Sequence, residues 1–133
     1  MERLADMLSA ADLALVCLDK AFTGFSVPSK TYGVLASGTP LLGFLDPQSE
    51  IGQMITEVGC GLVLAEPNGM QVAMTIRALQ SQPDQLLAMG QAGRKAFLDR
   101  YTLSHAAQAY DGALLSMSRT TVKTAPHLAT SER

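Results

Sequence analysis

The sequence predicts an α/β fold: a partial doubly wound, Rossmann-like parallel sheet with a helical C-terminal end. This prediction rests on three short apolar runs, at residues 13–18, 41–45 and 60–65. A helical pattern follows each run. Continuous apolar runs are typical of strands buried on both faces of a parallel sheet. Strands that alternate with helices favour a sheet covered by those helices and joined by right-handed crossovers. Because doubly wound domains usually have more than three strands, we interpret the chain as the back part of a larger domain.

The first half of the chain alternates helices with two of these strands. Residues 2–11 repeat apolar side chains at helical steps and lead into the strand at 13–18. A polar, glycine-containing loop is expected at 19–26. A short helix is expected over 30–37, and the strand at 41–45 follows it.

The second half of the chain becomes increasingly helical. Ser49 is a candidate cap for a helix over 49–58, and Gly59 ends that helix before the strand at 60–65. Apolar residues at three- and four-residue steps predict three more helices, over residues 70–80, 84–100 and 103–117.

Composition limits the class of protein and of partner. Of the 133 residues 47% are apolar, and we expect one domain over residues 1–118 before a disordered tail at 119–133, which lacks an apolar period. Ten basic and twelve acidic residues give a formal net charge of −2, so no basic field favours nucleic acid. No apolar run approaches the roughly 20 residues that span a membrane, and the N-terminus does not resemble a signal peptide. We therefore expect no nucleic-acid partner and no transmembrane segment.

The reactive side chains form no catalytic or metal-binding constellation in the sequence. Cys17 and Cys60 each lie in an apolar run without partners at metal-ligand spacing, and we interpret them as buried thiols of an intracellular chain in preference to a disulfide. His105 falls on the last predicted helix and His127 in the tail, where neither forms a Ser–His–Asp or Cys–His arrangement. We expect no metal site and no cofactor, and the sequence identifies no catalytic residue.

One stretch predicts an anion site, and the chain is organised around it: GFSVPSKTYGVLASGTP at residues 24–40. Pro28 favours an extended approach, and the hydroxyl of Ser29 is expected to cap the helix that follows. The free N–H groups of the first helical turn, the positive end of the helix dipole and the Lys30 ammonium together suit a phosphate group. The simpler alternative for Lys30 is a solvated surface charge. Gly38 is expected in the left-handed region just past this helix.

Gly33 and Glu50 are weaker candidates for ligand contact. A glycine inside a helix costs on the order of 1 kcal/mol relative to alanine. Gly33 therefore indicates close approach, either by a ligand or by a neighbouring strand. Glu50 falls in the first turn of the helix over 49–58, where the helix dipole favours a carboxylate. A structural role is therefore favoured for Glu50 over a contact with a ligand.

Several strings occur in a fixed order along the chain: LADMLSAADLALVCL, VPSKTYGVLASGTPLLGFLD, SEIGQMITEVGCGLVL and MGQAGRKAFLDRYT, followed by a closing helix. In this order they resemble the C-terminal part of a nucleotide-sugar glycosyltransferase of the large retaining family called group 1 or family 4, which has the two-domain GT-B fold. The PSK variant is similar to members that assemble bacterial surface polysaccharides. The resemblance covers most of this chain and less than half of a complete family enzyme.

The resemblance implies that this chain binds the nucleotide diphosphate of a nucleotide-sugar donor, while a missing N-terminal domain supplies most of the acceptor site. The family reaction retains the anomeric configuration and usually needs no protein-bound metal. A full-length enzyme would be cytoplasmic or peripheral at the inner membrane, and the isolated fragment is expected to have little or no transferase activity. The implied site residues are Pro28, Ser29 and Lys30 at the donor diphosphate, and Gly24, Gly33 and Glu50 along the donor pocket.

The chain departs from the family pattern at one pair of positions. Family members usually carry a glutamate on either side of the loop-to-helix corner, and the second commonly holds the ribose hydroxyls. The second position falls at Gly33, and residues 22–24 at the first are not acidic. Two other classes therefore stay open. One is another GT-B protein such as a sugar-nucleotide epimerase, and the other is a non-catalytic remnant or interaction module with an open sheet edge that self-associates.

Overall fold

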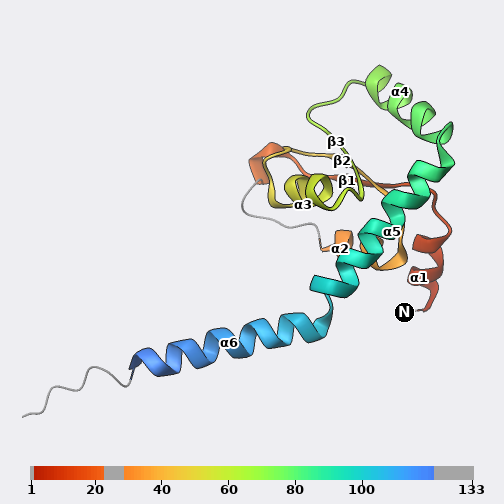
Figure 1. Ribbon diagram of the computed structural model, residues 1–133. Helices are drawn as coiled ribbons and strands as arrows, with labels where there is room; N and C mark the ends of the chain where they lie inside the picture. The colour runs from red at the N-terminus through yellow and green to blue at the C-terminus, as the bar shows by residue number, and fades with distance from the viewer. Residues whose placement is uncertain (1, 23–28, 122–133) are drawn as a thin grey trace, which may run out of the picture. The chain divides into compact units, whose positions relative to one another are not determined.

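The computed structural model describes residues 2–22 and 29–121 of the protein. The chain divides into two compact units, Met1–Tyr101 and Thr102–Arg133. The first unit contains the sheet, and its elements run α1 (Glu2–Ser9), β1 (Ala14–Cys17), the 3₁₀ turn η1 (Lys20–Phe22), α2 (Lys30–Ser37), β2 (Leu41–Phe44), α3 (Glu50–Val58), β3 (Gly61–Leu64), α4 (Gly69–Gln80) and α5 (Pro83–Arg100) (Figure 1).

The sheet is parallel and has the strand order β1-β2-β3. Cys17 of β1 lies beside Phe44 of β2, and Phe44 lies beside Leu64 of β3, so the three strands end at the same level. Parallel neighbours require crossover connections, which α2 and α3 provide. The predicted α/β class and the three predicted strands are confirmed.

The core lies between the sheet and helices α2, α3 and α5. Leu35 of α2, Leu41 of β2 and Ile55 of α3 are completely buried. Cys60, which lies between α3 and β3, is also completely buried. The buried residues of this cluster are Val16, Val34, Leu35, Leu41, Leu45, Ile51, Met54, Ile55 and Cys60.

Strand β1 corrects the prediction that each apolar run is buried on both faces. β1 lies at the edge of the sheet, and only its Val16 side is covered: Val16 is 7% exposed, whereas Leu15 is 56% exposed. Because successive side chains of a strand point to opposite faces, Leu15 and Cys17 share the uncovered face. The central strand β2 is buried at both Leu41 and Leu42, as predicted.

The two cysteines differ in exposure because Cys17 lies on the uncovered face of the edge strand β1. Cys17 is an exposed thiol, which corrects the prediction that it is buried, whereas Cys60 is buried as predicted. Both cysteines are free. Desolvation in the core disfavours the thiolate and raises the pKa of Cys60 to about 11.

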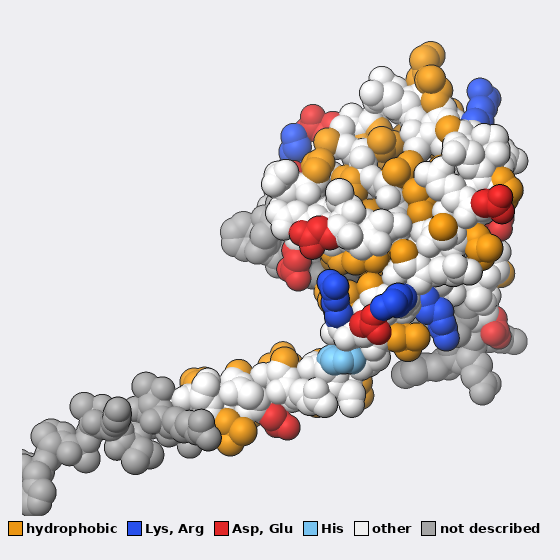
Figure 2. Space-filling view, viewed as in Figure 1, with side chains coloured by type: hydrophobic (Ala, Val, Ile, Leu, Met, Phe, Trp, Pro, Cys, Tyr) orange, Lys and Arg blue, Asp and Glu red, His pale blue; other side chains and the backbone are white. Residues whose placement is uncertain are grey.

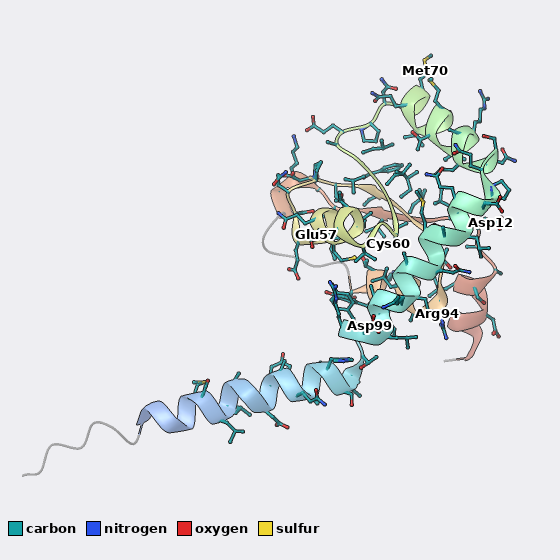
Figure 3. The ribbon with its side chains drawn as sticks, in the orientation of Figure 1. Asp12, Glu57, Cys60, Met70, Arg94 and Asp99 are labelled. Atoms are coloured by element: carbon teal, nitrogen blue, oxygen red, sulfur yellow. The ribbon has the colours of Figure 1, made fainter. Side chains whose placement is uncertain are left out.

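Helix α5 holds the C-terminal end of α2 through two glycines and an arginine. A Cβ atom at Gly90 would collide with the carbonyl oxygen of Gly38, and a Cβ atom at Gly93 would lie 3.0 Å from Cδ2 of Leu35. The guanidinium of Arg94, which projects from α5 in Figure 3, donates to the carbonyl oxygen of Ala36. Gly38 adopts the predicted left-handed conformation, with φ 75°. The MGQAGRK stretch therefore fixes α2 in place at this end.

The second unit contains α6 (Leu103–Thr121). At its start the hydroxyl of Thr102 and Nδ1 of His105 lie 2.7 Å apart. Residues 122–133 lie outside the described residues, so the division into a domain at 1–118 and a disordered tail at 119–133 stays a prediction. Among the described helices, none combines the length and the apolar character required to cross a membrane.

Candidate functional site

The N-termini of α2 and α3 lie at the edge of the sheet where the strands end. α2 begins at Lys30, after β1, and α3 begins at Glu50, after β2. In a parallel sheet the crossover connections leave every strand at its carboxyl end, which is also where ligands bind in open α/β sheets. The structure therefore brings Ser29, Lys30 and Glu50 to one edge. Pro28 and Gly24 lie outside the described residues, so their roles stay predictions.

The predicted cap at Ser29 is wrong. Ser29 has helical dihedral angles, φ −58° and ψ −26°, and its side chain makes no capping hydrogen bond. A serine hydroxyl caps the first turn from an extended backbone conformation, which Ser29 does not have. Ser29 and Lys30 are both exposed, and Lys30 forms no ion pair with any described residue. The first turn of α2 thus lacks the side-chain acceptor that the sequence predicted for it.

Thr31 adds a second unsatisfied group to the same turn. Its side chain is completely buried, and its hydroxyl has no hydrogen-bond partner among the described residues. Buried polar groups are nearly always paired, so an orphan hydroxyl indicates a group that is satisfied by something other than those residues. The first turn of α2 therefore combines N–H groups that the Ser29 side chain does not cap, a buried hydroxyl without a partner among the described residues, and the Lys30 ammonium.

The first turn of α3 is satisfied from within the chain. Ser49 has an extended conformation, with φ −64° and ψ 156°, and its hydroxyl oxygen accepts a hydrogen bond from the N–H of Gly52 at 3.1 Å. The same hydroxyl donates to the carbonyl oxygen of Asp46 at 2.6 Å. The predicted cap at Ser49 is therefore confirmed, and one N–H group of the first turn of α3 is satisfied by a side chain.

Glu50 and two tyrosines form a small group beside these helices. The rings of Tyr32 and Tyr101 have centroids 5.2 Å apart and are tilted by 49°. Burial raises the pKa of the Tyr32 phenol, and the charges of Glu50 and Tyr101 raise it further. The carboxylate of Glu50, itself exposed, thus lies within electrostatic reach of Tyr32 on α2. The sequence did not indicate Tyr101, because its contact with Tyr32 joins segments far apart in the chain.

Gly33 has room for a side chain. It is exposed, and a Cβ atom built on it would meet only Cδ1 of Leu8, at 3.6 Å, which is an ordinary van der Waals distance. The close helix–strand contact that the sequence offered as one explanation for this glycine is therefore wrong. Close approach by a ligand stays a prediction.

A pocket of about 270 Å³ opens at the carboxyl ends of the three strands. It was not predicted, although an acidic residue follows each apolar run at the same offset in the sequence. Asp19, Asp46 and Glu66 each lie two residues beyond the level at which the strands end together. The residues that line the pocket are Leu18, Asp19, Lys20, Phe44, Leu45, Asp46, Ala65, Glu66 and Pro67.

The charged side chains of this pocket are held in place. Oδ1 of Asp19 accepts the N–H of Ala21 at 2.9 Å, and Oδ1 of Asp46 accepts the N–H of Gln48 at 2.8 Å. The Lys20 ammonium pairs with Glu66 at 2.5 Å. The hydrogen bond and charge of Glu66 raise the pKa of Lys20, with a smaller contribution from Asp46. Carboxylate oxygens accept hydrogen bonds from hydroxyl groups and repel negative charge. This pocket therefore suits the hydroxyl groups of a ligand better than an anionic group.

Two further observations concern the backbone at Glu66 and the search for a metal site. Glu66 has φ 49°, in the left-handed region that residues other than glycine rarely adopt and that recurs at functional sites. The described residues contain no group of three or more histidine, cysteine or acidic side chains arranged to hold a metal ion.

Comparison with known proteins identifies the family. A family model described as glycosyl transferase-like matches residues 1–112. The chain belongs to this glycosyl transferase-like family. It is also 41% identical over 54 residues to a probable glycosyltransferase, WbjE, of Pseudomonas aeruginosa. That match covers 41% of this chain and 14% of the relative, so the chain corresponds to a small part of the relative's length.

The resemblance to glycosyltransferases in the sequence is thereby confirmed for the family. The family match covers the whole Met1–Tyr101 unit and continues into α6. It therefore includes both features found at the carboxyl edge of the sheet, namely the first turn of α2 and the pocket at the strand ends.

Proposed function

We propose that this chain is the donor-binding part of a glycosyltransferase, which transfers a sugar from a nucleotide-diphosphate sugar to an acceptor. The family membership supports the reaction class. The open first turn of α2 is the observation that carries the donor assignment, because its N–H groups have no capping side chain and the buried Thr31 hydroxyl has no partner among the described residues. A diphosphate would accept hydrogen bonds from N–H groups at the N-terminus of a helix.

Lys30 has the role of charge stabilisation in this proposal. Cleavage of the donor leaves a nucleotide diphosphate, on which negative charge grows in the transition state. The Lys30 ammonium and the positive end of the α2 dipole would oppose that growth, which is electrostatic stabilisation at the site where charge develops. Pro28 and Ser29 complete the diphosphate corner as the sequence predicted.

The remainder of the donor would follow the same edge of the sheet. Gly24, Gly33 and Glu50 are the proposed lining of the donor pocket. The absence of a side chain at Gly33 leaves space where the family pattern places a carboxylate, and the exposed Glu50 is the acidic residue that lies near Tyr32 on α2. Hydroxyl groups of the donor sugar suit the strand-end pocket, whose Asp19, Asp46 and Glu66 supply acceptors.

The acceptor site is proposed to come from an N-terminal domain, as the resemblance implies. On the same basis the enzyme would act in surface polysaccharide assembly, in the cytoplasm or at the inner membrane surface. The chain by itself would then bind a donor nucleotide weakly and transfer no sugar, since it would lack the acceptor half.

A calorimetric titration tests this proposal. The purified chain is titrated with UDP, GDP and ADP, alongside the variants Lys30→Ala and Lys95→Ala. Lys95 is an exposed lysine on α5 that pairs with Asp99, so it controls for the loss of a surface charge. We expect one nucleotide to bind, with the Lys30→Ala variant weaker by about tenfold or more and the Lys95→Ala variant unchanged.

Two results would contradict the proposal. The absence of binding by any of the three nucleotides to a folded chain would favour a non-catalytic remnant. Equal affinities of the Lys30→Ala variant and the parent chain would remove Lys30 from the site. Circular dichroism of each variant shows whether the chain has kept its fold.

A further inference from the structure

A second pocket, of about 630 Å³, lies at the amino ends of the strands, opposite the edge that carries the first turn of α2. One wall is formed just before β1 and β2, and the other by the junction of α4 and α5. Figure 2 shows hydrophobic side chains at the surface around this junction. All of the lining residues belong to the Met1–Tyr101 unit, so this unit alone defines the pocket. Its apolar wall includes Leu13, Pro40, Ile76, Leu79, Leu86 and Leu87.

The walls of this pocket are held by backbone hydrogen bonds. The N–H of Ala14 donates to the carbonyl oxygen of Pro40 at 2.9 Å, which joins the starts of β1 and β2. The N–H of Gln82 donates to the carbonyl oxygen of Leu79 at 2.9 Å, which fixes the turn between α4 and α5. Pro40 and Leu79 are themselves buried. A preformed cavity of this volume with mainly apolar walls is typical of a small-molecule site.

The polar side chains of the pocket specify the charge of a ligand. Asp12, labelled in Figure 3, is the one charged side chain among the described residues that line it. This carboxylate is exposed and makes no hydrogen bond or ion pair with any described residue. Arg94 approaches Gly38 from α5, but its guanidinium donates to the carbonyl oxygen of Ala36 and does not line the pocket. A lone carboxylate beside an apolar wall favours a cationic donor and repels an anion.

We propose that this pocket binds a small amphipathic cation, in which an apolar ring system carries one ammonium group. The rings would replace water against Leu79, Leu86 and Leu87, and the ammonium would donate to the Asp12 carboxylate. The amide oxygen of Gln80, which also lines the pocket, offers a second acceptor.

The proposed cation site is separate from the donor site. Each strand has four residues, so roughly 13 Å of sheet separates the pocket from the carboxyl edge. The two sites also favour ligands of opposite charge, an ammonium here and a diphosphate at α2. The proposal is therefore independent of nucleotide binding, and either site can fail its test without the other.

Tryptamine, tryptophol and indole-3-propionate test the proposal, because they share an indole body and differ in a cationic, neutral or anionic end group. Each compound is titrated into the ¹⁵N-labelled full chain, and amide chemical shifts report its position and affinity. We expect tryptamine to bind with a dissociation constant below about 1 mM. It should shift the N–H signals of Leu13, Leu79 and Leu87 and leave those of Lys30 and Thr31 in place. Tryptophol and indole-3-propionate should bind about threefold more weakly or worse.

Two pairs of variants separate the pocket from the general surface. Asp12→Asn removes the proposed partner of the ammonium, whereas Asp6→Asn removes an exposed carboxylate of α1 that does not line the pocket. Leu87→Gln alters the apolar wall, and Leu98→Gln is its control further along α5, with the two leucines 62% and 52% exposed. We expect Asp12→Asn and Leu87→Gln to weaken tryptamine binding by about threefold or more, and both controls to bind as the parent chain does.

Four results would overturn the proposal. The first is a folded parent chain that does not bind tryptamine. The second is equal affinity for the three indole compounds, which would remove the preference for a cation. The third is an Asp12→Asn variant that binds tryptamine as tightly as the parent chain. The fourth is a set of tryptamine-induced shifts that leaves the pocket unchanged, which would place the compound elsewhere. Far-ultraviolet circular dichroism shows whether each variant is folded.

Discussion

Helices α2 and α3 are alike in length and position, and they differ at their first turns. Both follow a strand of the parallel sheet, both are preceded by a serine, and both end at a glycine with positive φ. Ser49 caps α3 from an extended conformation, whereas Ser29 has a helical conformation and its side chain makes no capping hydrogen bond. The C-terminal end of α2 is fixed by α5, so its open first turn is not a sign of a poorly held helix. The contrast supports the proposal that α2 presents its N-terminus to the donor diphosphate.

The largest expected effect concerns the fixed end of α2. Gly90→Ala should lower the free energy of unfolding by about 1–3 kcal/mol, because its Cβ atom would press against the carbonyl oxygen of Gly38. Gly69→Ala is the matched control, since a Cβ atom there meets nothing within 4 Å. Urea denaturation measures both. If Gly90→Ala is as stable as Gly69→Ala, the contact between α5 and α2 does not fix that end.

The two serines give a smaller effect that compares the first turns directly. Ser49→Ala should lower the free energy of unfolding by about 1 kcal/mol, because the N–H of Gly52 loses its acceptor. Ser29→Ala should change it by less than about 0.5 kcal/mol, because the Ser29 hydroxyl caps nothing. The same denaturation series reports both values. Equal losses at the two serines would mean that the helices are capped alike.

Gly33→Ala should have a modest effect of the opposite sign, and it sharpens the role of this position. The Cβ atom fits at an ordinary distance from Leu8, so the variant should gain up to about 1 kcal/mol in free energy of unfolding from better helix propensity. A ligand that approaches the backbone of α2 at Gly33 would then bind the variant more weakly, which calorimetry with the preferred nucleotide measures. A loss of stability in Gly33→Ala would show that the glycine is needed by the fold itself.

Much of the fold was predictable because its signals are local. The apolar runs located all three strands, and α2 has the bounds expected from the Pro28-Ser29 corner and from Gly38. The prediction failed at β1, because an apolar run carries no information on whether its strand lies at an edge or in the middle of a sheet. Leu15 and Cys17 are exposed for that reason.

The candidate site was predictable only in part. Residue type suggested a cap at both Ser29 and Ser49, but the backbone conformation decides whether a hydroxyl can reach the first turn. The strand-end pocket was missed because the strand register brings Asp19, Asp46 and Glu66 to one level, and a register is a property of the paired strands. The same limit applies to the contact between Tyr32 and Tyr101.

A titration of the ¹⁵N-labelled chain with UDP, GDP or ADP, followed by amide chemical shifts, tests most directly whether α2 holds the donor diphosphate. We expect the N–H signals of Lys30, Thr31 and Tyr32 in the first turn of α2 to shift on binding, while those of Ile51 and Gly52 in the capped first turn of α3 stay in place. Shifts at α3 without shifts at α2, or nucleotide binding that moves neither set, would contradict that role of α2.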